Sequence, residues 1–244
     1  DYTAGIPDAF GIVTSFYSRQ SGNWENASTW SNAGYGGAEA STIPSASNPV
    51  FIGDGAANNH IVNVITGNAV AGSLSIISGS VLDIGATTGN NFGTVIPGST
   101  GTLRITSNTS TALFPAGDFG NFLGQSGGLV DYYTNGLSYY LPVVSNAPTS
   151  LALTTYHDLA LSPASGYSIT MPNIDLNIYG YMLVNRASVT GMARLNAASI
   201  RSLTIRDSLR VNSGTLRFQN NIAQNLRIDG GISIASGAVF DVAN

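Results

Sequence analysis

The side chains that carry most enzyme chemistry are scarce in this sequence. Its 244 residues include 13 acidic residues, nine basic residues that are all arginine, two histidines and no cysteine. A polysaccharide lyase holds Ca²⁺ with several carboxylates, yet no two acidic residues here lie within three positions of each other. His60 and His157 lack another His, Cys or carboxylate at metal-ligand spacing. We therefore predict no catalytic residues, no metal site and no cofactor.

One pair of carboxylates has a spacing that a glycosidase could use. Glycosidases place two carboxyl groups about 5–9.5 Å apart, and Asp207 and Asp229 lie 22 positions apart in a repetitive segment. Arg206 precedes Asp207 directly and offers an ion pair instead. We favour charge pairing over catalysis for these residues.

Aromatic side chains are the other candidates for chemistry, because an exposed ring can stack on a sugar. The competing interpretation is structural, with the two tryptophans packed in a cap and the tyrosines paired across strands. The candidate glycan-binding residues are Trp24, Trp30, Tyr132, Tyr133, Tyr139 and Tyr140.

The composition predicts which elements hold these residues. Only 9% of the chain is charged, against about 25% in an average protein, and there are 29 glycines. The chain has only two Glu and no Lys, which are residues that usually cover surface helices, so it predicts β-structure with many turns. No apolar run is long enough to span a membrane. Seven of the nine arginines lie in residues 186–244 with few aromatics between them, which favours a solvated strand face over nucleic-acid binding.

A repeat near the end of the sequence organises the chain. Short runs alternate apolar and polar residues, which is the period of a half-buried strand, and three such runs recur every 22–27 residues. This pattern predicts an all-β fold, a right-handed parallel β-helix with about three strands per turn. The apolar positions Leu203, Ile205, Leu209, Val211 and Leu216 match Leu226, Ile228, Ile232, Ile234 and Val239, 23 residues later, and Leu176, Ile178, Met182, Val184 and Val189, 27 residues earlier.

The repeat makes specific predictions about neighbours in space. Equivalent residues of successive turns stack about 4.8 Å apart, so Arg206 is expected beside Asp229, and Asn185 beside Asn212. The four-residue difference between the two spacings is expected in the loop around residues 191–198.

Departures from the repeat divide the chain. Residues 1–44 contain both tryptophans and no repeat, and we expect a cap there. Residues 45–106 read as the first turns of the β-helix, and residues 107–150 as an irregular insertion with a hairpin at Asn135-Gly136. Residues 151–244 read as further turns. Because the last strand is followed by no polar closing element, we expect the native polypeptide to continue.

Several short segments of the sequence resemble segments of a known group of proteins. The first is Ser21-Gly22-Asn23-Trp24-Glu25-Asn26-Ala27-Ser28-Thr29-Trp30-Ser31 with the later Asn48-Pro49-Val50-Phe51-Ile52-Gly53; the others are Phe114-Pro115-Ala116-Gly117-Asp118-Phe119, Gly127-Gly128-Leu129-Val130-Asp131-Tyr132-Tyr133 and Thr155-Tyr156-His157-Asp158-Leu159. In this order they are similar to secreted surface proteins of Bacteroidota, which include large gliding-motility adhesins exported by the type 9 secretion system. The resemblance implies an extracellular location at the cell surface, associated with the outer membrane. It also implies surface polysaccharide or other cell-surface and secretion-system proteins as partners.

The same resemblance draws attention to a modification. Asp207-Ser208-Leu209 resembles the O-glycosylation signal of this group, in which Asp precedes Ser or Thr and an apolar residue follows. A plain turn before a strand is the competing interpretation, and it is the one that we favour.

The sequence thus predicts a structural and adhesive module of a large bacterial surface protein, not an enzyme. A carbohydrate-binding β-helix module is the alternative, and a polysaccharide lyase or glycosidase is a third possibility, because β-helices of that kind exist.

Overall fold

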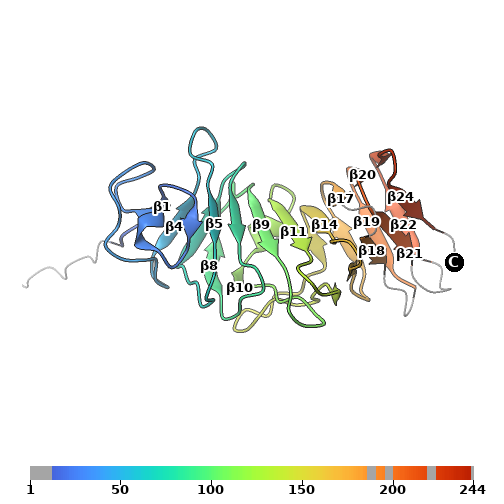
Figure 1. Ribbon diagram of the computed structural model, residues 1–244, viewed down its shortest axis with the longest axis horizontal. Coiled ribbons are helices and arrows are strands. Elements are labelled where there is room, and N and C mark those ends of the chain that lie inside the picture. Colours follow the sequence, from blue (N-terminus) through green and yellow to red (C-terminus); the bar gives the residue numbers. More distant parts are fainter. Residues whose placement is uncertain (1–12, 186–190, 196–199, 219–223, 243–244) are drawn as a thin grey trace, which may run out of the picture.

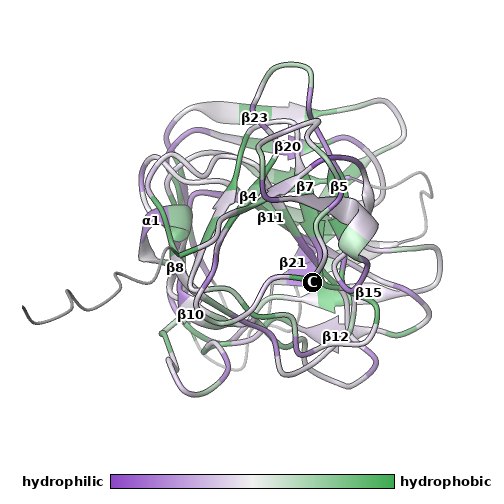
Figure 2. Ribbon diagram, turned by 90° about the vertical axis from the view of Figure 1, so that its left-hand side faces the viewer, coloured by the Kyte–Doolittle hydropathy of each residue, from purple (hydrophilic) through white to green (hydrophobic). Residues whose placement is uncertain are grey.

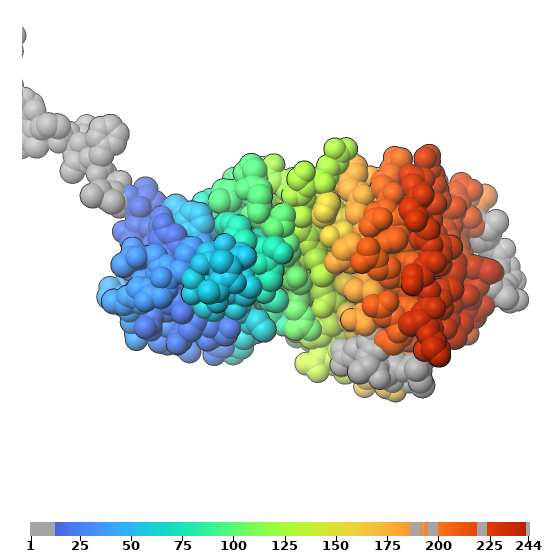
Figure 3. Space-filling view, turned by 90° about the horizontal axis from the view of Figure 1, so that it is seen from above, coloured from blue at the N-terminus to red at the C-terminus, as the bar shows by residue number. Residues whose placement is uncertain are grey.

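The protein is a parallel β-helix of about seven turns. The computed structural model describes residues 13–185, 191–195, 200–218 and 224–242. The turns follow one another along the long axis (Figure 1). Figure 2, viewed along that axis, shows the strands of successive turns lying behind one another around a common centre. The space-filling view shows the same order as successive bands of colour (Figure 3).

One sheet of nine strands, called here the long sheet, runs through the molecule from the first turn to the last. At about 4.8 Å per strand it extends for roughly 40 Å. In spatial order its strands are β2 (Gly22–Asn23), β5 (Ile61–Asn63), β7 (Val81–Asp83), β9 (Thr102–Ile105), β11 (Leu129–Tyr133), β14 (Asp158–Ser162), β17 (Met182–Val184), β20 (Ser208–Val211) and β23 (Gly231–Ile234).

A six-stranded sheet forms a second face in the N-terminal half. Its strands are β10 (Ala116–Asp118), β8 (Asn91–Val95), β6 (Ser73–Ile76), β4 (Pro49–Ile52), β1 (Phe16–Ser18) and β3 (Trp30–Ser31). The short helix α1 (Gly120–Leu123) contacts both β8 and β13 (Thr155–Tyr156), a strand of the four-stranded sheet described below.

The C-terminal half completes its three faces with two further sheets. The four-stranded sheet contains β13 (Thr155–Tyr156), β16 (Leu176–Ile178), β19 (Ser202–Ile205) and β22 (Asn225–Ile228). The five-stranded sheet contains β12 (Tyr139–Tyr140), β15 (Ser168–Thr170), β18 (Met192–Leu195), β21 (Thr215–Phe218) and β24 (Val239–Asp241).

Alternation along each strand builds the core. In β16, β19 and β20 the two apolar residues point inward and are buried, while the residue between them is more exposed. Since each strand pairs in parallel with its equivalent in the next turn, these apolar residues stack in columns. One turn has no second layer of its own, so its apolar residues are covered by the neighbouring turns.

The predicted register is confirmed at most positions. Leu176, Leu203 and Leu226 are successive partners in the four-stranded sheet. In the long sheet Met182, Leu209 and Ile232 form a second column, followed two positions later by Val184, Val211 and Ile234. In the long sheet from β5 onward, the spacing between paired residues of successive turns varies slightly more than predicted, from 20 positions between Val62 and Leu82 to 29 between Val130 and Leu159.

The prediction for the five-stranded sheet was wrong at two points. Leu216 pairs with Phe240, not Val239, because the corner before β24 is one residue longer than the corner before β21. On its other side Leu216 pairs with Ala193, and Val189 lies outside the described residues. The extra four residues therefore fall between Val184 and Ala193, before β18, and not in the predicted loop.

The predicted hairpin at Asn135-Gly136 is not formed. Strand β11 pairs in parallel with β9 and β14, and β12 pairs in parallel with β15. Gly136 has a φ of +93°, as a tight turn requires, but the turn is a corner that passes from one sheet to another. Within residues 107–150, β10, β11 and β12 are thus strands of the β-helix.

The N-terminal segment adds short strands to the first edges of two sheets. Strand β1 pairs with β4 in parallel and with β3 in an antiparallel ladder, and β2 pairs with β5. The 3₁₀ turn η1 (Ala27–Thr29) connects β2 to β3. The antiparallel β3 is the outermost strand of the six-stranded sheet.

Two similar segments, Ser78-Gly79-Ser80-Val81 and Ser236-Gly237-Ala238-Val239, form the same type of corner on different faces of the β-helix. Gly79 and Gly237 have φ values of +87° and +79°. In both corners a backbone N–H donates to the carbonyl three residues earlier, from Ser80 to Ile77 at 2.9 Å and from Ala238 to Ala235 at 3.0 Å. The first corner leads from the six-stranded sheet to the long sheet, and the second from the long sheet to the five-stranded sheet. The local sequence therefore specifies the turn but not the face.

Candidate functional site

Both tryptophans lie in the core. Trp24 and Trp30 are 1% and 0% exposed, and their rings meet edge to face with centroids 5.0 Å apart. The indole N–H of Trp30 donates to the carbonyl of Trp24 at 2.8 Å, and Phe92 packs on Trp24. With no ring face at the surface, neither residue can stack on a sugar, which corrects the glycan-binding prediction for both.

Two of the four predicted tyrosines are buried as well. Tyr132 is 0% exposed, and its hydroxyl hydrogen-bonds that of Tyr156 at 3.1 Å across the core. The hydroxyl of Tyr139 donates to the carbonyl of Tyr133 at 2.8 Å. Burial raises the pKa of both Tyr132 and Tyr139. Their hydroxyls and rings complete the core and are not accessible to a ligand.

The remaining two tyrosines are more accessible. Tyr133 is half-buried, and the Arg104 guanidinium covers one face of its ring, 4.3 Å from the centroid. Tyr140 is 46% exposed on β12. The six predicted aromatics are therefore not assembled into one binding surface.

Arg104 joins two carboxylates on the outer face of the long sheet. Its guanidinium lies 3.1 Å from Asp83 and 3.1 Å from Asp131, which are its partners in the preceding and following turns. The hydroxyl of Tyr133 donates to Asp83 at 3.0 Å, and that of Ser162 to Asp131 at 2.7 Å. Burial of Tyr133 raises the pKa of its hydroxyl, and the negative charge of Asp83 raises it further. Each carboxylate is therefore occupied by a cation and a hydroxyl.

A column of polar residues follows the corner between the four-stranded and long sheets. Tyr156, Ile178, Ile205 and Ile228 point inward, and the next residue in each turn points outward. These outward residues are His157, Tyr179, Arg206 and Asp229. The backbone hydrogen bonds between turns extend to these outward residues, because the Arg206 N–H donates to the Ile178 carbonyl at 2.9 Å. Tyr179 and Arg206 are therefore side by side, about 4.8 Å apart along the axis.

An open hollow of about 400 Å³ lies against this column. It is lined by Tyr179 and Arg206 and by Gln125, which follows α1. Gln125 and Arg206 are exposed and Tyr179 is partly exposed. We did not predict Tyr179 as a site residue, although the 27-residue spacing to Arg206 and the alternation of the strand together contained the signal.

The arginine of this hollow belongs to a group with more cations than anions. The Arg206 guanidinium lies 3.5 Å from Asp229, as predicted from the repeat, and 3.3 Å from the Asn177 side chain. Asp229 is also 2.7 Å from Arg227. The two guanidinium groups hold the pKa of Asp229 below its usual range, mainly through the hydrogen bond from Arg227. Two positive charges thus share one negative charge.

A second cluster lies around the corner on the long sheet. The carboxylate of Asp158 accepts the Tyr181 N–H at 2.8 Å, and Arg210 lies over the Tyr181 ring at 4.5 Å. Arg210 also pairs with Asp207 at 3.4 Å. Burial raises the pKa of Asp158, and the Tyr181 N–H, His157 and Arg210 offset only part of that effect.

Asp207 and Asp229 are both held in ion pairs, as the sequence interpretation favoured. Asp207 is paired with Arg210 and Asp229 with Arg206 and Arg227. Neither carboxylate lines the hollow beside Arg206.

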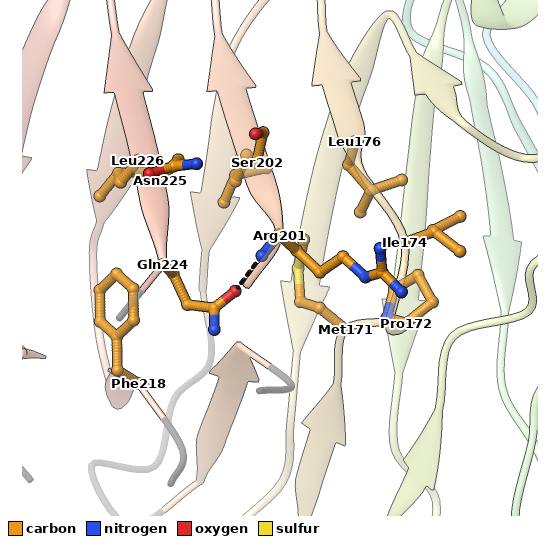
Figure 4. Close-up of a pocket in the computed structure, with 11 residues that line it drawn as sticks. Met171, Pro172, Ile174, Leu176, Arg201, Ser202, Phe218, Gln224, Asn225 and Leu226 are labelled. Carbon is orange, nitrogen blue, oxygen red and sulfur yellow. Dashed lines mark hydrogen bonds between the residues drawn. The ribbon is translucent and has the colours of Figure 1, made fainter. Parts of the chain in front are cut away.

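A separate apolar pocket lies between the four-stranded and five-stranded sheets (Figure 4). Met171, Pro172 and Leu176 line one side and Phe218 and Leu226 the other. The Arg201 N–H donates to the Gln224 side chain at 2.9 Å across it. It holds about 20 Å³ of space, which admits roughly one water molecule and no sugar ring.

Ser208 begins β20 on the outer face of the long sheet. Its hydroxyl accepts a hydrogen bond from Arg210 at 2.9 Å, and it is partly exposed. O-glycosylation of Ser208 stays a prediction, and attachment of a sugar there would displace Arg210.

Within the part of the chain that the structure describes, no three His, Cys, Asp or Glu side chains converge as a metal site. In the same residues no helix has the length and apolar character needed to cross a membrane.

Comparison of the chain with protein-family models, with curated proteins and with solved structures finds no match.

Proposed function

We propose that this chain is a non-catalytic, adhesive and structural module of a large bacterial cell-surface protein, located outside the cell. The observation that supports the proposal is the long sheet, whose nine strands continue from the first turn to the last. Such a ladder places surface residues at fixed distances along a rod, which suits a spacer that presents binding sites away from a membrane.

The surface chemistry supports a binding role more than a catalytic one. Arg104 engages Asp83 and Asp131, and Arg210 engages Asp207. A general acid or base must be free to exchange a proton with substrate, and these carboxylates are held as ion pairs. The resemblance to gliding-motility adhesins agrees with this role and supplies the expected setting, with surface polysaccharide or other surface and secretion-system proteins as partners.

Bead adhesion tests the proposal. Beads coated with the purified chain are perfused over immobilised bacterial polysaccharide and over intact cells, while released reducing ends and unsaturated sugars are measured in the effluent. We expect retention of the beads without any steady release of sugar. The Ile205→Asp variant, which places a carboxylate in the core, is the unfolded control.

Steady cleavage of the polysaccharide would contradict the non-catalytic assignment. Failure of the beads to be retained on both polysaccharide and cells would contradict the adhesive one.

A carbohydrate-binding module is the second candidate, and the hollow beside Tyr179 favours it. A volume of about 400 Å³ lies in the range of ligand sites, about 300–1,000 Å³. This candidate is compatible with adhesion, because a glycan-binding site on a rod is one way to adhere.

A further inference from the structure

We propose that the hollow lined by Gln125, Tyr179 and Arg206 binds an acidic sugar residue, one that carries a carboxylate or sulfate group. The proposal rests on the proposed adhesive function and names the ligand class and the site. It places the site at the corner between the four-stranded and long sheets, away from the six aromatics predicted from the sequence.

The charge of the ligand follows from the ion pairs beside the hollow. Asp229 is shared by Arg206 and Arg227, at 3.5 and 2.7 Å. Asp229 lies closer to Arg227 than to Arg206. The Arg206 side chain is 48% exposed, so its guanidinium retains hydrogen-bond donors for another anion. A planar guanidinium binds carboxylate or sulfate oxygens with two parallel hydrogen bonds. Two other carboxylates, Asp207 and Asp158, interact with Arg210 on the long sheet.

The remaining lining residues favour a sugar over an acidic peptide. Tyr179 presents a partly exposed aromatic ring next to Arg206, and the C–H face of a pyranose packs on such a ring. Gln125 approaches from the α1 side with one amide, which donates to and accepts from sugar hydroxyls. The hollow is lined by more polar than apolar surface, so it offers no pocket for the apolar side chains that anchor peptides.

The experiment measures binding of three soluble probes by isothermal titration calorimetry. The probes are oligogalacturonate, neutral dextran fragments of similar length, and poly-glutamate. We expect oligogalacturonate to bind, to bind more weakly as NaCl is raised from about 50 to about 500 mM, and to bind more tightly than either other probe.

The structure offers matched variants for this test. Arg206→Gln removes the guanidinium of the hollow, while Arg217→Gln removes an arginine of nearly equal exposure, 47%, that pairs with Asp241 in the next turn at 2.8 Å and lines no part of the hollow. We expect Arg206→Gln to lower the affinity for oligogalacturonate about tenfold or more, and Arg217→Gln to leave it within about twofold. Tyr179→Ala is expected to lower it about fivefold, with Tyr140→Ala as its exposed control.

Thermal unfolding of every variant separates lost binding from lost fold. Should Tyr179→Ala unfold, Arg206→Gln still decides, because loss of an exposed ion pair changes the stability of a protein little.

Three results would overturn the site. They are absence of oligogalacturonate binding, equal binding by Arg206→Gln and Arg217→Gln, or tighter binding of poly-glutamate. If wild-type beads adhere to polysaccharide while oligogalacturonate does not bind the soluble chain, this site is wrong and the adhesive function stands. If wild-type beads adhere to nothing while oligogalacturonate binds at the hollow, the site stands and the adhesive function is wrong.

Discussion

At the scale of single residues, the outer surface is organised by ion pairs between adjacent turns. Arg206 pairs with Asp229, Arg217 with Asp241, and Arg104 with both Asp83 and Asp131. Neighbouring turns are about 4.8 Å apart, so charged side chains in one column attract each other if their charges are opposite and repel each other if they are alike. At these positions opposite charges in register replace the repulsion that like charges would produce.

Arg104 neutralises two carboxylates at once, Asp83 and Asp131. Replacing it by Gln leaves Asp83 and Asp131 as two carboxylates, each only partly exposed, and removes the cation over the Tyr133 ring. We expect a loss of about 1–2 kcal/mol in the free energy of unfolding, measured with urea. The control Arg227→Gln, at a side chain 66% exposed, is expected to change stability by less than about 0.5 kcal/mol. Equal effects of the two substitutions would refute the special role of Arg104.

Asp158 gives the protein a specific dependence on pH. Its folded-state pKa is raised above the ordinary 3.8 by burial, so the folded state binds this proton more tightly than the unfolded state. Ionisation of Asp158 therefore lowers stability as the pH rises from 3.8 through the folded-state pKa. In Asp158→Asn the amide oxygen still accepts the Tyr181 N–H.

We expect Asp158→Asn to gain stability relative to wild type as the pH is raised from below 3.8 to neutral, measured by urea unfolding at each pH. A stability difference that stays constant with pH, or shrinks, would show that burial does not control this carboxyl group.

At the scale of elements, the burial of a strand's inward side chains depends on having a neighbouring strand on both sides. Leu209 is fully buried between Met182 and Ile232 in the long sheet. Ile232 occupies the same position in the last described turn and is 53% exposed. Strand β23 is the final strand of the long sheet, so within the described structure only one of its sides is covered.

This contrast predicts two different costs for truncation in one column. Leu209→Ala is expected to lower the free energy of unfolding by about 2–5 kcal/mol, because it leaves a cavity between turns. Ile232→Ala removes a side chain that is already half in water, and we expect a loss of about 1 kcal/mol or less. Chemical denaturation of the two variants measures both values. Similar losses would mean that β23 is covered in solution by something that contacts Ile232.

At the scale of the whole molecule, the protein is a one-dimensional stack in which each turn contacts mainly the turns beside it. The strand ladders link each strand to its equivalents in the preceding and following turns, and the three faces repeat this order. Stability of such a stack is close to a sum over turns and the interfaces between them. Whole turns are therefore exchangeable units, provided that the register is kept.

Deletion of one turn tests this description. Removing residues 203–225 joins Ser202 to Leu226, which takes the inward position of Leu203 and brings Ile232 beside Met182. We expect a folded, shorter protein with an unchanged type of circular dichroism spectrum. Removing residues 203–224 instead puts Asn225 at the inward position and reverses every later side chain in that strand.

We expect the 22-residue deletion to lose cooperative unfolding in the C-terminal turns, whereas the 23-residue deletion keeps it. Loss of cooperative unfolding in both deletions would argue against independent turns.

Parts of the site were predictable, and others were not. The pairing of Arg206 with Asp229 follows from a fixed spacing in a repeat, because equivalent residues must stack. The burial of Trp24 and Tyr132 was the structural interpretation weighed against glycan stacking, and alternation alone does not say which face a short irregular strand presents. The hollow at Tyr179 could not be predicted, because its third lining residue, Gln125, is 54 positions away in the sequence and belongs to no repeat.

The sequence by itself determined that this protein is a parallel β-helix and which apolar residues form its columns, because period-two alternation repeated at nearly constant spacing satisfies the backbone and buries the core only in a stack. Only the tertiary structure decided where the corners lie, that Tyr132 and Tyr139 face inward, and that Arg104 joins Asp83 to Asp131. The physical reason is that corner loops of variable length set the rotation of each turn, and loop length has no period for a sequence pattern to reveal.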